Sequence, residues 1–567
     1  MRPKPRPRHL IAIAILAGTA ALYALLAWQE CRLSDAQVHA TTVALKEHRH
    51  DLYARDPFFS RPPLWNAHNP LFTAMVAGVL RLGGWQDLLL PYRLMVPLVA
   101  MLYLCSMYAL LYRQCRNWSV AVFVAVLSSA VTDTLGPAYW GLGALDTMTS
   151  AAWVQALVPL IVLAFLRWQQ AGRLASTRHL LLLFVLIGLL GNLSPAWAMN
   201  LTVVLLAVHL ALRRFSPRAL LTGLALGLAA LAGALPYLIY FYRLRVHLAG
   251  PDAFVRGGRV FEALRMVDPQ YLYPDMPRSL LNWALLAALL VVPAVLTLAR
   301  YERYRSRDLK FWVLFGSIAL GVALVFQAAS QLVGYLTRMG PPTVEFVHAS
   351  SLAMVALYVL FAQSLGNLFR LVKVHRALLR SACALLAAIY MIPSDNLRPL
   401  RHALVDTMTM AMEEVDKPEF IRDRHEDEHR RYELRAISAW ADRHTPTDAV
   451  FVTELSEFRM AARRSIVAAR HDIRIIYYLA PWLLDEWVTR LDRMTRVLNP
   501  RTGKIDPEAL TVLAGEFAHQ APFRGAGAWF VIARAPVAPE GQGVLDQVPA
   551  EGWGRFYRVF KLPAPAP

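Results

Sequence analysis

The chain has 567 residues, of which 56% are apolar and 17% are charged. Soluble domains average roughly 45–50% apolar and about 25% charged residues, so this composition excludes a single soluble globule. Intrinsic disorder is excluded too, because 15 Trp, 21 Tyr and 24 Phe are too many buried-type side chains for a solvated coil. Apolar runs of about 20 residues recur and predict a multi-pass membrane protein.

The charge is divided unevenly along the chain. From Arg398 to the carboxyl terminus there are 24 Lys and Arg against 24 Asp and Glu, so the net charge of +19 belongs to the residues before it. Basic loops beside anionic lipid headgroups explain this pattern more simply than nucleic acid does, so no nucleic-acid partner is expected. The four cysteines have no paired spacing and indicate neither a disulfide framework nor a zinc site.

The first apolar segment, 10–28, follows four basic residues and is not followed by a small-residue cleavage site. We expect it to be a retained first helix with the amino terminus in the cytoplasm. Ten further spans are predicted at about 88–112, 119–134, 151–167, 179–193, 197–212, 219–242, 279–299, 311–336, 346–369 and 377–393. With simple alternation every cytoplasmic turn is basic, which agrees with the positive-inside rule for a plasma (inner) membrane protein.

Eleven spans place the remainder of the chain outside the cell. The predicted fold is mainly α: residues 1–397 form a polytopic membrane bundle of about 11 transmembrane helices, with long outer loops at 29–87 and 243–278. Residues 398–567 form a small extracytoplasmic α/β domain. In the first loop, 70–85 is too short to span and is expected to lie in the interface. In the tail, the pattern predicts a charged helical stretch at 406–444, strands at 449–453, 465–469, 529–533 and 556–562, and a helix at 481–497.

The first group of candidate site residues follows the first helix. If that segment is helical, Asp35 and His39 are four residues apart and share one face. A carboxylate beside an imidazole at a membrane surface could accept a proton from an incoming hydroxyl. An interfacial Asp/His pair without a catalytic role is an equally good interpretation.

A second carboxylate, Asp146, stands immediately before an apolar helix, where unpaired amide groups can stabilise it. Capping alone would explain its position. A third group lies in the proline-stiffened first loop and at the start of the next span, and its arrangement suits a phosphate or pyrophosphate ligand as well as it suits lipid anchoring. Its members are Arg55, Asp56, Arg61, His68 and Arg93.

This order of residues resembles the GT-C glycosyltransferases, in their aminoarabinose- and mannosyltransferase branches. The shared features, within residues 10–165, are an acidic residue after helix one, the Pro62-Pro63-Leu64 loop, an interfacial apolar stretch, an Arg opening the next span and a Leu-Asp pair before span four. The resemblance implies an inverting transferase that takes a sugar from a polyprenyl-phosphate donor to an envelope acceptor on the outer face. The tail resembles the ends of uncharacterised bacterial multi-pass membrane proteins.

Carried over to this chain, the resemblance makes Asp35 the catalytic base or metal contact, with Asp146 as the second acidic residue and the candidate ligand of a divalent metal, Mg²⁺ or Mn²⁺. Two departures leave metal dependence open: Asp35 is followed by Ala36 instead of Glu, and the second loop has no Asp-x-Asp. Arg256 and Arg259, in the loop 243–278, are expected to clamp the donor phosphate, although loops of this length need not obey the positive-inside rule.

Two alternative functions are a transporter or lipid flippase and a non-catalytic scaffold. A transporter or lipid flippase would usually carry charged groups near the bilayer midplane, whereas the predicted spans contain almost none. A non-catalytic scaffold predicts that Asp35 and Asp146 can be replaced without loss of function.

Overall fold

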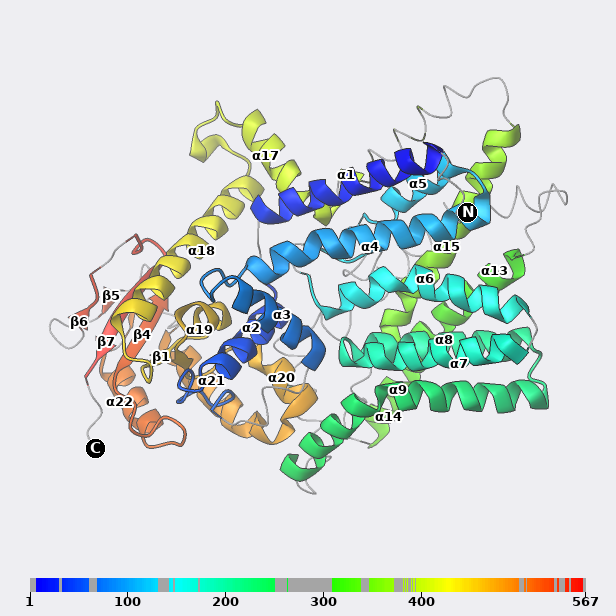
Figure 1. The fold of residues 1–567 in the computed structure, drawn as a ribbon. Coiled ribbons are helices and arrows are strands. Elements are labelled where there is room, and N and C mark those ends of the chain that lie inside the picture. Colours follow the sequence, from blue (N-terminus) through cyan, green and yellow to red (C-terminus); the bar gives the residue numbers. More distant parts are fainter. Residues whose placement is uncertain are drawn as a thin grey trace.

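The structure is a computed structural model, and it describes most of the chain. The described residues are 7–29, 33–60, 69–130, 142–145, 148–171, 174–249, 263, 308–337, 346–371, 381, 383, 385, 389, 391–392, 394–498, 504–505, 507–534, 538–539, 546–549 and 552–563. A helical bundle and a smaller carboxyl-terminal domain with a sheet lie side by side (Figure 1).

Seven segments of the described part are long and apolar enough to cross a bilayer. They are α1 (Pro7–Gln29), α4 (Leu90–Cys115), α6 (Ser150–Ala171), α8 (Pro195–Leu212), α9 (Pro217–Ala249), the run α13 (Leu309–Gly321), η6 (Val322–Phe326) and α14 (Gln327–Thr337), and η7 (Phe346–His348) with α15 (Ala349–Leu371). Each coincides with a span predicted from hydropathy. A multi-pass membrane protein is therefore confirmed at this level.

Two other predicted spans correspond to shorter helices. α5 (Trp118–Leu127) has 10 residues, about 15 Å of helix. It is followed by a turn at Ser128 and Ser129, and the rest of the predicted span, 131–134, lies outside the described residues. α7 (Leu174–Leu189) continues into η3 (Leu190–Asn192). The predicted span 279–299 lies outside the described residues and 377–393 is described only in part, so the number of eleven spans stays a prediction.

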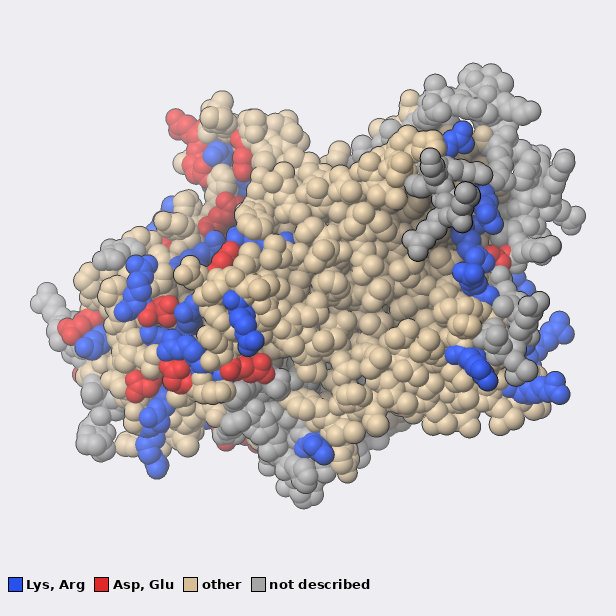
Figure 2. Space-filling view, in the orientation of Figure 1, with Lys and Arg blue, Asp and Glu red and all other residues tan. Residues whose placement is uncertain are grey.

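The amino terminus lies at the end of the bundle opposite the carboxyl-terminal domain (Figure 1). There, His9 Nδ1 is 2.8 Å from the hydroxyl of Tyr108, near the end of α4. Lys and Arg gather at this end, whereas the middle of the bundle shows almost no charge (Figure 2). The helix ends supply the described basic residues Arg113, Arg167, Arg178, Arg213, Arg218 and Lys310.

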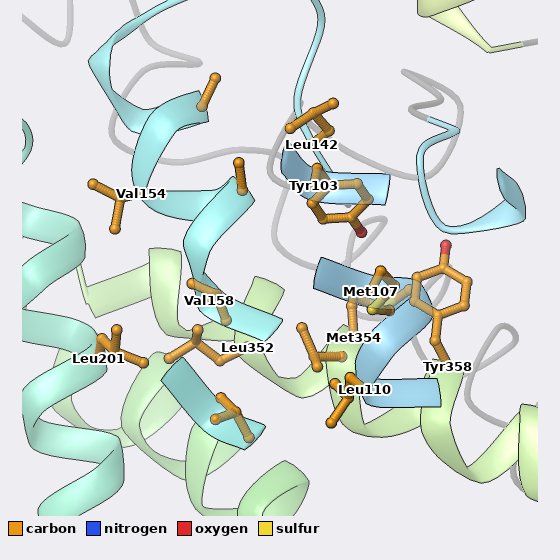
Figure 3. Close-up of a cluster of buried hydrophobic side chains, with 14 of the residues drawn as sticks. Tyr103, Met107, Leu110, Leu142, Val154, Val158, Leu201, Leu352, Met354 and Tyr358 are labelled. Carbon is orange, nitrogen blue, oxygen red and sulfur yellow. The ribbon is translucent and has the colours of Figure 1, made fainter. Parts of the chain in front are cut away.

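The bundle is held together by apolar side chains that α4, α6, α8 and α15 point toward one another (Figure 3). Met107 and Leu110 of α4, Val158 of α6 and Leu201 of α8 are buried in this cluster. Four helices meet there because each presents bulky aliphatic or thioether groups on the face turned inward, and close packing of such groups is what stabilises helix association within a bilayer.

The carboxyl-terminal domain contains a five-stranded sheet in the order β2-β1-β4-β7-β6. Its strands are β1 (Val450–Val452), β2 (Ser465–Ile466), β4 (Trp529–Arg534), β6 (Asp546–Gln547) and β7 (Tyr557–Leu562); β3 (Lys504–Ile505) pairs with β5 (Ala538–Pro539) in a second sheet. β1 runs parallel to β2 and β4, and β7 runs antiparallel to β4 and β6. Four of the five strands are at predicted positions, because their apolar residues are buried on both sides of the sheet.

The remaining helices of this part of the chain either lead from the bundle to the sheet or belong to the domain around it. Those that lead to the sheet are α17 (Arg398–Met408), η8 (Asp395–Leu397) and η9 (Glu414–Asp416). Those of the domain are α18 (Glu419–His444), α19 (Ser456–Ala462), α20 (Asp472–Leu479), η10 (Pro481–Leu483), α21 (Leu484–Leu498) and α22 (Pro507–Ala518). The charged stretch predicted at 406–444 is divided between α17 and α18, since the helical path stops at Met408 and Pro418 precedes α18.

The loop after α1 belongs structurally to both parts of the molecule. It contains α2 (Asp35–His48) and α3 (Pro70–Leu82), the helix predicted for the interface. Val43, Tyr53 and Phe59 of this loop are buried in one apolar cluster with β1 and β4 of the carboxyl-terminal domain. The core of that domain is therefore completed by residues near the amino terminus.

Candidate active site at the junction

We call the region where the carboxyl-terminal domain meets the bundle the junction; it comprises α2, the first turn of α4, α19 and α20. Asp35 enters it at the first position of α2, six residues after the end of α1. The helix starts here because Ser34 caps it: the Gln37 amide donates to Ser34 Oγ, and the Ser34 amide donates to Gln37 Oε1 at 2.8 Å. A carboxylate in this first turn is favoured by the helix dipole.

The bundle fixes the position of α2. The hydroxyl of Tyr92, in the first turn of α4, donates to the carbonyl oxygen of Gln37 at 2.8 Å and lies 2.7 Å from the hydroxyl of Thr41. Both groups are buried, where a hydrogen bond is costly to leave unmade. The carboxylate of Asp35 is therefore held at a defined place beside the end of the bundle.

The carboxyl-terminal domain supplies the partner of Asp35. Nδ1 of His471, the residue before α20, lies 2.9 Å from Oδ2 of Asp35, and 26% of the Asp35 side chain stays exposed. Glu457 of α19 is the third ionisable group: burial raises its pKa, the positive charges of Arg431 and Arg435 oppose that rise, and the negative charge of Asp35 adds to it. The junction thus combines an accessible carboxylate with an imidazole and a second acid.

The second member of the predicted pair, His39, is one turn further along α2, as the helical spacing requires. The carboxylate of Asp35 lies against His471, however, and the ring of His39 lies 5.7 Å from the ring of Phe59. Two imidazoles therefore accompany Asp35, one from its own helix and one from the other end of the chain.

Arg93 also lies at the junction, one residue after Tyr92. Its Nη1 donates to Oδ2 of Asp87 at 3.0 Å, and its guanidinium carbon is 5.1 Å from the centre of the Trp28 ring at the end of α1. Stacking on Trp28 holds the cation at the level where α1 leaves the bundle. Arg93 thus lies in the first turn of α4, and its part in a phosphate site stays a prediction.

Asp56 is fully buried, and its carboxylate is occupied by protein groups. Oδ1 accepts from the amides of Phe58 and Phe59, and Oδ2 lies 2.8 Å from Nε of Arg459. Arg459 also donates to both oxygens of Asp472, at 2.7 and 2.8 Å. Burial raises the pKa of Asp56, and the charge of Arg459 opposes that rise. The contacts of Asp56 join the first loop to the carboxyl-terminal domain.

Arg55 takes part in the same attachment. Its amide donates to Ser465 Oγ at 3.2 Å, and its Nη2 donates to the carbonyl oxygen of Gly525 at 3.1 Å. Both partners belong to the carboxyl-terminal domain. Of the residues predicted to bind a phosphate, Arg55 and Asp56 thus form the interface between the loop and this domain, and Arg93 lies beside Trp28.

The other predicted site residues, Asp146, Arg61, His68, Arg256 and Arg259, lie outside the described residues. Residues 142–145, immediately before Asp146, are described. The side chain of Asn396 donates to the carbonyl oxygens of Ser129 and Gly143, and its Oδ1 accepts from the amide of Leu145 at 2.8 Å. Asn396 therefore fixes the chain that leads into Asp146.

The described residues contain no group of three or more His, Cys, Asp or Glu side chains placed to hold a metal ion. The predicted ligand of Mg²⁺ or Mn²⁺, Asp146, lies outside them. No step proposed below passes through a metal ion.

Sequence reasoning did not identify His471, Glu457 or Asn396. Each acts through a partner that is distant in the chain, and none belongs to a motif. Arg459 lies in the tail whose sequence resembles the ends of bacterial multi-pass membrane proteins, and that resemblance assigned it no role. The spacing of residues within one segment could not have shown these pairings.

No protein-family model and no curated protein sequence matches the chain. Among solved structures, the chain is similar to a crystal structure described as the Archaeoglobus fulgidus oligosaccharyltransferase in complex with Zn and sulfate. The TM-score is 0.46 and the identity 13%, over 92% of this chain and 68% of that chain. That description names a glycosyl-transferring enzyme, as does the resemblance found in the sequence. A TM-score at this level carries no argument about activity, so the proposals that follow depend on the contacts of this chain.

Proposed function

We propose that the chain is a membrane glycosyltransferase of the GT-C type, which transfers a sugar from a polyprenyl-phosphate donor to an acceptor at the junction. One observation carries the proposal: the partly exposed carboxylate of Asp35, just beyond the end of α1, is held by the bundle through α2 and paired with His471 from the other domain. Transfer from a lipid-borne donor to an acceptor hydroxyl needs a base that can take the hydroxyl proton.

The proposed reaction is a single displacement. The acceptor hydroxyl oxygen attacks the anomeric carbon as the bond between that carbon and the phosphate oxygen breaks, and the polyprenyl phosphate leaves with the bonding electron pair. The hydroxyl proton passes to the carboxylate of Asp35. His471, 2.9 Å away, orients the carboxylate. The anomeric configuration is inverted because there is one displacement.

The roles of the remaining residues follow from the resemblance and from position. Arg93, at the mouth of α4, is the described residue best placed to meet the donor phosphate, because a half-buried guanidinium binds phosphate strongly. Arg61, His68, Arg256 and Arg259 complete the proposed phosphate site, and Asp146 assists Asp35. His39 helps to orient Asp35.

We further propose that the junction faces the outside of the plasma membrane. The basic helix ends at the opposite end of the bundle support this orientation (Figure 2), because basic residues concentrate on the cytoplasmic side. The donor would then be used on the outer face, and the acceptor would be a component of the cell envelope.

The test is a transfer assay with the purified chain in lipid nanodiscs. Synthetic polyprenyl-phosphate mannose and polyprenyl-phosphate aminoarabinose are supplied with an envelope lipid extract as the acceptor, and released polyprenyl phosphate is measured. Removal of a general base typically lowers the rate about 10²–10⁴-fold. We therefore expect Asp35→Asn to lose transfer at that scale while the protein stays folded and inserted.

The matched control is Asp51→Asn in the same loop, where an exposed carboxylate pairs with Arg49. This variant should keep the rate of the wild type. Equal rates for Asp35→Asn and the wild type would exclude Asp35 as the base. Release of no polyprenyl phosphate by the wild type from either donor would exclude the two proposed sugar classes.

A further inference from the structure

The connection from the bundle to α18 exposes an unusual set of large apolar side chains. We call residues 398–420 the hairpin; it consists of α17, η9 and the first residues of α18. Its exposed apolar side chains are Leu400 at 49%, Leu404 at 60%, Met408 at 76%, Met410 at 84%, Val415 at 78% and Phe420 at 65% of full exposure. Soluble surfaces rarely expose a contiguous set of this kind.

Three of these side chains lie on one side of α17. Leu400, Leu404 and Met408 are spaced by four residues along α17 and therefore form a single apolar stripe. The opposite side of the helix carries His402 and Asp406, which are partly buried. A short helix with one apolar stripe and one charged face is suited to a boundary between apolar and polar surroundings.

The position of the hairpin indicates which apolar medium covers the stripe. α17 lies beside α1 and projects sideways from the molecule, at the level where α1 ends (Figure 1). α1 itself exposes Leu25 at 58% and Trp28 at 49% close to this level. The partly described helical segment before α17 exposes Leu385 and Ile389 at 62% each. Exposed apolar side chains of the bundle and of the hairpin therefore occur at the same end of α1.

The acidic and the uncharged surfaces of the hairpin lie on different sides. Figure 2 shows acidic atoms on the side turned toward the carboxyl-terminal domain and uncharged surface on the side turned toward the bundle. The acidic residues Glu413, Glu414 and Asp416 are exposed. A protein partner could cover the apolar side chains whether the charges lay beside them or on the other side. A bilayer requires the charges to lie on the side away from its hydrocarbon.

Ion pairs hold the hairpin in this shape. Arg424 of α18 pairs with Asp406 of α17, and His425 lies 3.2 Å from Asp406 and 2.8 Å from Glu414. The hydrogen bonds to Glu414 from Lys417 and His425 lower the pKa of Glu414 to about 2. These contacts therefore join α17 and η9 to α18.

We propose that the hairpin binds the surface of the membrane beside the bundle, with the stripe of α17 and Met410 in the boundary between headgroups and acyl chains. This contact connects the last part of the bundle to α18 and sets the height of the carboxyl-terminal domain above the lipid. The inference does not depend on the proposed transferase activity.

The test uses the wild-type protein in nanodiscs of phosphatidylethanolamine and phosphatidylglycerol that contain a diazirine-bearing phospholipid. After illumination, lipid adducts are mapped by mass spectrometry. We expect adducts on the peptides that carry Leu404 and Met410. The positive control is α9, whose Leu221 is 70% exposed and should also carry adducts. Val512 of α22 is 60% exposed in the carboxyl-terminal domain and should carry none. A variant with Leu404→Gln, Met408→Gln and Met410→Gln should lose most of the hairpin adducts and retain those on α9.

Hydroxyl-radical oxidation of Met408 and Met410 in the same nanodiscs completes the test. Lipid adducts together with protection from oxidation support the proposal. Adducts on α9 but none on the hairpin overturn it: oxidised methionines would then show that water covers the stripe, and protected ones would show that protein covers it.

Discussion

Nε of Arg459 lies 2.8 Å from Oδ2 of Asp56, and both side chains are almost fully shielded from solvent. Asp56 belongs to the loop after the first helix, whereas Arg459 belongs to α19 of the carboxyl-terminal domain. Arg459 also forms a bidentate pair with Asp472. The buried group formed by these three residues therefore contains one cation and two carboxylates. Such a group keeps two segments in register, and it is sensitive to the loss of any member.

Replacement of Arg459 should therefore destabilise the protein strongly. Arg459→Met leaves two buried carboxylates without a cation, and breaking a buried pair in this way costs about 3–5 kcal/mol. Thermal unfolding of the detergent-solubilised protein should show a marked decrease in Tm. Arg496→Met serves as the control, because the pair that it removes, with Asp492, is exposed and worth at most about 1 kcal/mol. Similar Tm values for the two variants would show that the buried group contributes little.

The raised pKa of Glu457 predicts how stability depends on pH. A carboxyl whose folded pKa is raised above its ordinary value of 4.5 contributes stability in its protonated form, and this contribution is lost as the pH rises through the folded pKa. Glu457→Gln cannot ionise, so its Tm should exceed that of the wild type at pH 8 and equal it near pH 4. Asp423→Asn, on the exposed side of α18, should show no such divergence. A constant difference for Glu457→Gln at both pH values would refute the assignment.

Asn396→Asp should disturb the segment before Asp146. The Asn396 amide donates to two carbonyl oxygens, of Ser129 and Gly143, and a carboxylate cannot donate to either. Loss of these buried hydrogen bonds should cost about 1–3 kcal/mol and reduce the transfer rate if Asp146 assists catalysis. Asn192→Asp is the control, since that exposed amide donates only to its own helix. Tm and rate are measured together, and wild-type values of both would contradict the prediction.

The topology predicts opposite sides of the membrane for the two ends of the bundle. Arg218→Cys, at the start of α9, and Val512→Cys, in α22, both lie at exposed positions. In intact cells an impermeant maleimide should label Val512→Cys and should reach Arg218→Cys only after permeabilisation. The wild type reports the labelling of native cysteines. Labelling of both variants in intact cells would contradict the topology.

Hydropathy was sufficient to predict the long helices, because α1, α4 and α15 must satisfy every backbone group within the apolar segment itself. The strands β1 and β4 were predictable for a related reason: they are buried on both faces and read as continuous apolar runs. The short helices α19 and α20 were missed, since their burial depends on what packs against them and their own patterns are brief.

In the candidate site, too, local features were predictable from the sequence and contacts between distant segments were not. The sequence predicted Asp35 just after the first helix, and the structure has it at the start of α2, which Ser34 caps locally. It did not predict His471 as the partner, because that pair is made only when the carboxyl-terminal domain meets α2. Asp56 looked like a ligand for an external group for the same reason: its cation, Arg459, comes from a distant segment.

The shared core of the first loop and the carboxyl-terminal domain has a consequence for how the protein is made. The buried residues Tyr53 and Phe59 leave the ribosome early, whereas β4 and β7, which complete their surroundings, are among the last residues synthesised. At roughly 5–20 residues per second, the intervening chain of about 500 residues takes about half a minute to two minutes to emerge. Throughout that interval the loop must wait with its aromatic residues uncovered, so the newly inserted chain depends on chaperones or on the lipid surface until its last strands arrive.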